Sequence, residues 1–121
     1  MHEFYFEKLS VWQNARILVK DVYITTASFP ENERFGVISQ LRRATMSIAA
    51  NIAEGMSRSG DKDKLRFLNQ AYSSAIEVIN FLILSHDLSF IAEAQYNELR
   101  DKVEYITNQI QALSKKIGTQ S

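Results

Sequence analysis

The chain has 121 residues, the length of a single domain, and its 14 basic and 14 acidic side chains cancel to a formal net charge of zero. That balance argues against a broad basic surface for nucleic acid, which requires an excess of lysine and arginine. The absence of cysteine excludes disulfides and thiolate chemistry and is compatible with a reducing cytoplasm, where we expect the protein to act.

The chain opens with residues 1–8, a segment with three consecutive aromatic side chains that we expect to dock on the body of the protein. Ser10 followed by Gln13 is typical of a capping box, the arrangement that opens a helix. Apolar residues then recur every three or four positions. Because Pro30 disfavours helical geometry at the preceding residue, the sequence predicts a first helix over residues 10–29.

A second helix is predicted over residues 36–54, with an apolar core stripe on one side and a face of mostly short side chains opposite it. The opposite face consists of Gln40, Arg43, Ser47, Ala50 and Glu54. Such a face normally carries long charged side chains, but here most are short, so a helix of another copy of the protein could approach closely. Gly55 fits the left-handed position that closes a helix.

The third predicted helix, residues 61–87, is apolar over much of its circumference. One seam contains Leu65, Leu68, Tyr72, Ala75, Ile79 and Leu82, and the seam beside it contains Phe67, Ala71, Ser74, Val78 and Phe81. A helix of this kind is buried on more than one side. In a chain of this length, the double seam favours an interface between subunits.

The fourth predicted helix, residues 92–117, has a single narrow apolar stripe, and we expect residues 118–121 to form a disordered tail. Four amphipathic helices with short connections favour antiparallel neighbours. The sequence therefore predicts an all-α, single-domain, antiparallel up-down-up-down four-helix bundle over residues 9–117. No apolar run approaches the 18 or so residues of a membrane span, so no membrane association is expected.

The charged residues of the second and third helices have structural and functional interpretations. For Glu54, at the unfavourable negative end of a helix dipole, we expect a salt bridge rather than a catalytic role. Its candidate partners are Arg43, Arg58 and Arg66. Glu77, midway along an apolar helix, needs a partner or a raised pKa. We interpret five residues as a structural motif: Arg43, Ser47, Asn51, Glu54 and Gly55.

No arrangement typical of an enzyme is present. Di-metal sites of helical bundles use Glu-x-x-His motifs, and neither His2 nor His86 lies three residues after a glutamate. No nucleophile is marked, and there is no glycine-rich phosphate loop. We therefore expect no catalysis, metal, cofactor or small-molecule substrate.

One local basic cluster supports a second hypothesis, nucleic-acid or partner binding. It consists of Arg58, Lys62, Lys64 and Arg66, with Arg42 as a further candidate. Two aspartates, Asp61 and Asp63, are interleaved with these residues and dilute the charge. The ordinary explanation of such a run is a solvated first helical turn, and the role of Arg42 stays open between a ligand contact and an ion pair.

Several segments together resemble the bacterial four-helix-bundle proteins encoded in intervening sequences of 23S ribosomal RNA genes. They are Leu9–Ala15, Phe29–Gly36, Gln40–Ala44, Ser47-Ile48, Asn51–Gly55 and Arg66–Leu68, with Ala75 and Glu77. The resemblance covers about residues 9–117, and the combination is far more specific than any one segment.

The resemblance implies an up-down bundle, a ring-shaped homopentamer and kinship with accessory proteins of diversity-generating retroelements, which work with a reverse transcriptase and its RNA. Those relatives are strongly basic whereas this chain is neutral, and the family supplies no catalytic residues. Our leading hypothesis is a non-enzymatic homo-oligomeric scaffold that binds a protein or nucleoprotein partner. The alternative is an RNA- or DNA-binding accessory protein that uses the basic cluster.

Overall fold

The computed structural model describes residues 1–120, with side chains described for residues 1–119. Its four long helices are α1 (Ser10–Thr26), α2 (Val37–Met56), α3 (Asp61–Asp87) and α4 (Glu93–Gln120). Two short 3-10 helices, η1 (Tyr5–Lys8) and η2 (Glu31–Glu33), precede α1 and α2 respectively. No strand occurs in residues 1–120.

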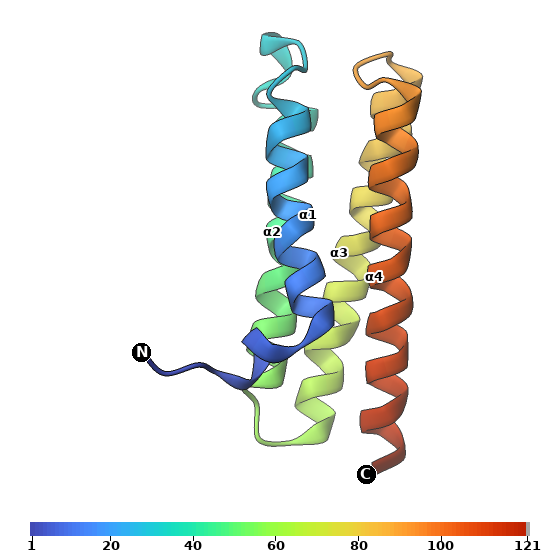
Figure 1. Cartoon of the computed structure of the whole chain (residues 1–121). Helices are drawn as coiled ribbons and strands as arrows, with labels where there is room; N and C mark the ends of the chain where they lie inside the picture. The colour runs from blue at the N-terminus through green and yellow to red at the C-terminus, as the bar shows by residue number, and fades with distance from the viewer. Residues whose placement is uncertain (121) are drawn as a thin grey trace.

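The four helices form the predicted antiparallel bundle, with each helix running opposite to the one before it (Figure 1). Each helix packs against two neighbours, α1 against α2 and α4, and α3 against α2 and α4. The apolar stripes of all four helices meet in one continuous core. Its largest fully buried side chains include Leu18, Leu41, Ile48, Ile52, Leu68, Leu82, Ile106 and Ile110. The prediction of fold class is therefore confirmed.

Three helices end at positions other than those predicted. Helix α1 ends at Thr26 rather than at residue 29, because the amides of Ser28 and Phe29 bond to carbonyls three residues back and tighten the chain into a turn. Helix α2 continues through residue 56 instead of ending at residue 54. Helix α4 extends to residue 120, so that residues 118–120 of the expected tail are helical, and Ser121 lies outside the described residues.

The predicted capping box at Ser10 is wrong. No side chain caps the first turn of α1; the Gln13 amide donates instead to the backbone carbonyl of Glu7, at 2.8 Å. The Ser10 hydroxyl accepts a hydrogen bond from Gln109 of α4. Only part of the expected docking of residues 1–8 is seen: η1 contacts α1 and α2, and the rings of Phe6 and Trp12 meet edge to face at 5.0 Å between centroids. Residues 1–4 are exposed, and the N-terminal end of the chain extends away from the bundle (Figure 1).

The connection from α3 to α4 closes with a left-handed residue, Ser89, whose φ is 62°. The Ser89 amide donates to the carbonyl of His86, and the Phe90 amide donates to that of Ser85. These two bonds form a Schellman motif, which satisfies carbonyls at the end of a helix. At this end of the bundle the rings of Phe29 and Phe90 pack at 6.0 Å between centroids, so the α1–α2 and α3–α4 connections are joined.

No described helix combines the length and the apolar character needed to cross a membrane.

Candidate interaction surfaces

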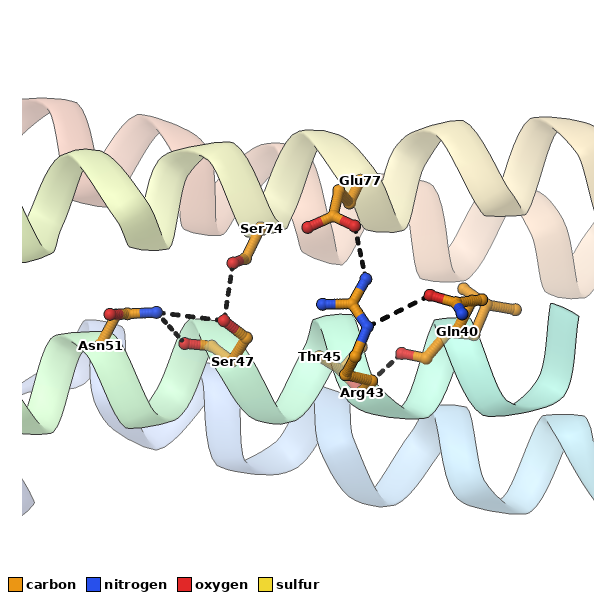
Figure 2. A network of polar contacts seen from close by, with 8 residues as sticks. Gln40, Arg43, Thr45, Ser47, Asn51, Ser74 and Glu77 are labelled. Carbon is orange, nitrogen blue, oxygen red and sulfur yellow. Dashed lines mark hydrogen bonds and ion pairs between the residues drawn. The ribbon is translucent and has the colours of Figure 1, made fainter. Parts of the chain in front are cut away.

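Polar contacts join α2 to α3 along the outside of the bundle (Figure 2). Arg43 Nη2 lies 2.5 Å from a carboxylate oxygen of Glu77, and Arg43 Nε donates to Gln40 at 3.1 Å. Both members of the ion pair are about half exposed, with side-chain exposures of 52% and 43%. Arg43 thus forms an ion pair within the chain, and Glu77 has the cationic partner that the sequence predicts, although it is not buried.

The short side chains of α2 serve this same contact. The hydroxyls of Ser47 and Ser74 are 2.8 Å apart, and Asn51 Nδ2 donates to both the hydroxyl and the carbonyl of Ser47 (Figure 2). The sequence predicts that a helix of another copy covers this small surface. Part of it faces α3 of the same chain, because a pair of serines allows two helices to approach closely without leaving a polar group unpaired.

Gly55 has a different role from the one predicted. It lies within α2, and among the described residues no glycine has a positive φ, so Gly55 is not a left-handed cap. A Cβ built at Gly55 would stand 2.8 Å from the Cβ of Phe67 and 3.4 Å from the carbonyl of Lys64. The missing side chain therefore lets the end of α2 approach the start of α3.

The salt bridge predicted for Glu54 does not form. Glu54 is exposed, and no ion pair within the described part of the chain includes it. Its three candidate partners bind other carboxylates: Arg43 binds Glu77, whereas Arg58 and Arg66 both bind Asp63. Because Glu54 lies in contact with solvent, its unfavourable interaction with the helix dipole is screened and needs no partner.

The basic cluster surrounds an aromatic ring at the α2–α3 turn. The guanidinium carbons of Arg58 and Arg66 lie over the ring of Phe67, at 4.6 and 4.4 Å from its centroid. The same two arginines share Asp63, with N–O distances of 3.6 and 2.7 Å. Half of the cluster is therefore engaged in local packing and partly neutralised, while Lys62 and Lys64 form no ion pair within the described residues.

Arg42 does not join this cluster, because it lies near the start of α2, about 20 Å of helix away from the α2–α3 turn. Its guanidinium carbon is 4.4 Å from the ring centroid of Tyr23, and Arg42 Nε donates to the Thr26 hydroxyl at 3.0 Å. Arg42 therefore connects α2 to the end of α1. A shallow groove here is lined by Tyr23, Arg34, Phe35, Ile38, Ser39, Arg42, Arg43 and Met46.

The apolar seams of α3 are accounted for within a single chain. Every residue of the two predicted seams is buried or half-buried, against α2 on one side and α4 on the other. The double seam therefore gives no argument of its own for an interface between subunits, because contacts within the chain account for the burial of these residues.

Other apolar side chains remain exposed, and the sequence interpretation did not single them out. On α1 these are Ile17 and Ile24, with exposures of 52% and 63%, and on α3 they are Ile76 and Ile83. Each pair is separated by seven residues, so its members lie on one face of their helix. They fall outside the core stripes, where a lone apolar residue carries no signal, and only the repeated spacing could have identified them.

Helices α1 and α4 are joined by polar contacts along a second groove. Lys102 lies 2.5 Å from Asp21, and Asn14 donates to Gln109 at 2.9 Å. The hydrogen bond to Asp21 is the main reason that the pKa of Lys102 is raised above its ordinary value, against the opposing effect of burial. Ile17 and Tyr105 line this groove and are both exposed.

Neither groove offers a set of metal ligands. Across the described residues, no three His, Cys, Asp or Glu side chains come together in a way that could hold a metal ion.

Both the sequence and the fold have counterparts among known proteins. The model of the family described as "23S rRNA-intervening sequence protein" matches residues 7–112. A solved structure of a protein of unknown function, from the S23 ribosomal protein family of Bacteroides thetaiotaomicron, superimposes with a TM-score of 0.79. It is 23% identical, and the alignment covers 87% of this chain and 98% of the other, so it shows the shared fold. No curated protein matches the sequence.

Proposed function

The chain belongs to the 23S rRNA-intervening sequence protein family, and we propose that it acts there as a non-enzymatic homo-oligomeric scaffold that binds a protein or nucleoprotein partner in the cytoplasm. The matched relative has no assigned function, and neither match supplies a catalytic activity. The observation that carries the proposal is the placement of the exposed isoleucines on α1 and α3.

The four exposed isoleucines form two regularly spaced pairs, each of which gives one helix a small apolar face. Ile17 and Ile24 lie on the side of α1 that borders α4, where Ile17 shares a groove with Tyr105. Ile76 and Ile83 belong to α3, which does not contact α1. The two pairs are therefore separate surfaces, and both would be removed from water if the α1 face of one copy packed on the α3 face of the next.

A contact between two different faces has a consequence for assembly. Such a head-to-tail contact leaves one free face at each end of a chain of subunits, so it produces a closed ring or an open filament. A closed ring agrees with the homopentamer that the family resemblance implies. The five-fold number comes from that resemblance, whereas the two faces come from the exposed isoleucines.

Multi-angle light scattering tests this proposal. The wild-type chain should have the mass of a closed oligomer, expected to be five copies. The double variants Ile17→Glu/Ile24→Glu and Ile76→Glu/Ile83→Glu should each be monomeric, because a buried unpaired carboxylate opposes the contact. Gln70→Glu, at an exposed position on a different side of α3 from Ile76 and Ile83, is a matched control and should leave the mass unchanged.

Mixing the two double variants distinguishes a head-to-tail contact from a symmetric one. Each variant keeps one intact face, so a mixture should form dimers that cannot grow further. A symmetric contact through either face would leave one of the two variants associated by itself. A wild-type chain that stays monomeric at micromolar concentration would overturn the proposal.

Nucleic-acid binding by the basic cluster is the second candidate, and it has less support. Arg58 and Arg66 share Asp63, and Arg42 lies at the other end of α2. If RNA is nevertheless bound at low salt, replacing Lys62 and Lys64 with glutamine should weaken binding and flatten its salt dependence, since fewer counterions are released. Unchanged binding in that variant would exclude the basic cluster as the RNA-binding site.

A further inference from the structure

The groove between the end of α1 and the start of α2 contains two arginines that no carboxylate neutralises. Arg34 and Arg42 both line it, and no ion pair in the described part of the chain includes either. Arg34 is exposed and its guanidinium carbon lies 5.0 Å from the ring centroid of Phe35. Arg42 donates hydrogen bonds to uncharged oxygens of Thr26 and Tyr23.

Apolar side chains stand beside these two positive charges. Phe35 is 87% exposed, the highest value of any large apolar side chain among the described residues after Met1, and Met46 is 52% exposed. The hydroxyl of Tyr23 donates to the sulfur of Met46, at 3.3 Å, and so holds that side chain at the groove. A partner that covered Phe35 and Met46 would gain from apolar burial and from the unpaired guanidinium groups at once.

We propose that this groove binds an acidic segment of a protein partner, in which a carboxylate is next to an apolar side chain. The proposal deepens the scaffold function, on which it rests, by naming the chemistry of the partner. A guanidinium group binds a carboxylate through two parallel hydrogen bonds, and Arg42 has five N–H donors, of which the bonds to Thr26 and Tyr23 use only part.

The surroundings of the groove favour a peptide over nucleic acid. Glu31 lines the adjoining groove together with Arg34 and Arg42, and Glu33 is the next carboxylate along the chain. These carboxylates would repel the regularly spaced charges of a phosphate backbone. A peptide can instead place one carboxylate between the two arginines and direct neutral side chains toward Glu31.

Fluorescence anisotropy of a fluorescein-labelled peptide with a single glutamate between two leucines and otherwise neutral residues, titrated with the full chain, tests this proposal. Binding should be saturable, and the double variant Arg34→Gln/Phe35→Ser should weaken it by roughly tenfold, the effect of losing one charge-assisted contact and its apolar neighbour. Both residues are exposed, so the variant should fold normally. The control Arg16→Gln replaces another exposed arginine on an aromatic ring, Trp12, outside the groove.

Four outcomes would overturn the proposal: no saturable binding, equal binding of a peptide with glutamine in place of glutamate, equal binding by the Arg34→Gln/Phe35→Ser variant, or tighter binding of unlabelled polyuridylate as a competitor. A changed oligomer mass for that variant would assign the groove to self-association and overturn it as well. If the peptide does not bind but the wild-type chain is oligomeric, only the proposal for this groove is rejected. If the wild-type chain is monomeric, the proposed scaffold function is rejected.

Discussion

Gly55 of α2 and Phe67 of α3 lie so close together that a Cβ on the glycine would stand 2.8 Å from the Cβ of the phenylalanine. The Cβ of Phe67 is fixed to its own backbone and cannot rotate away. Gly55→Ala should therefore lower the free energy of unfolding by about 1–2 kcal/mol, because the steric cost exceeds the better helix propensity of alanine. Urea unfolding measures this change.

Gly118→Ala is the matched control for that substitution. A Cβ at Gly118 of α4 would meet nothing within 4 Å, so the variant should be as stable as the wild type or slightly more stable. If Gly55→Ala were equally harmless, the close approach of α2 and α3 at this point would be refuted.

The ion pair between Arg43 and Glu77 should contribute little to stability because both partners are about half exposed. Glu77→Gln should lower the free energy of unfolding by less than about 1 kcal/mol, and the loss should shrink in high salt. Glu54→Gln, a substitution of the same type on α2, should change nothing at either salt concentration, since Glu54 forms no ion pair within the described residues. A larger effect of Glu54→Gln would contradict the assignment of Glu77 as the partner.

Ser89 has a left-handed backbone that side chains disfavour. Ser89→Gly should raise the free energy of unfolding by about 0.5 kcal/mol, because relief of the steric cost outweighs the extra entropy of glycine in the unfolded chain. Ser89→Ala, which keeps a Cβ, should have no such effect. Thermal unfolding of the two variants side by side separates backbone strain from loss of the hydroxyl.

The contact between Lys102 of α4 and Asp21 of α1 should make stability depend on alkaline pH. Because the pKa of Lys102 is raised in the folded protein, its contribution is fully present below the pKa of the unfolded chain and is lost as pH rises through the folded value. The difference in unfolding free energy between wild type and Asp21→Asn should therefore be constant near neutral pH and shrink at alkaline pH. A difference that grew with alkaline pH would reverse the assigned direction of the pKa shift.

Periodicity predicted the bundle because each helix has to bury an apolar stripe, and the stripes of Leu18, Leu41, Leu82 and Ile106 do meet in the core. Helix ends were harder. Whether Ser10 caps its helix depends on competing bonds to Gln109 and to distant parts of the fold, which no local pattern records.

The sequence also could not predict which neighbouring helix each side chain of α2 contacts. Spacing placed Arg43 and Glu54 on one face and so favoured their pairing, but Arg43 lies beside Glu77 only once α3 has packed there. Similarly, the small residue Ser47 indicated a close helix without indicating whose helix it was. The exposed isoleucines can be recognised as surface residues only in the folded chain, where other residues form the core.

The docking of η1 on α1 determines what the protein's intrinsic emission can report. The chain has a single tryptophan, Trp12, which is half-buried between the ring of Phe6 and the guanidinium group of Arg16. Its fluorescence is therefore sensitive to detachment of the first eight residues, even when the four helices stay assembled. A spectral change on mild heating would then register the release of this segment, and circular dichroism is needed to follow the bundle itself.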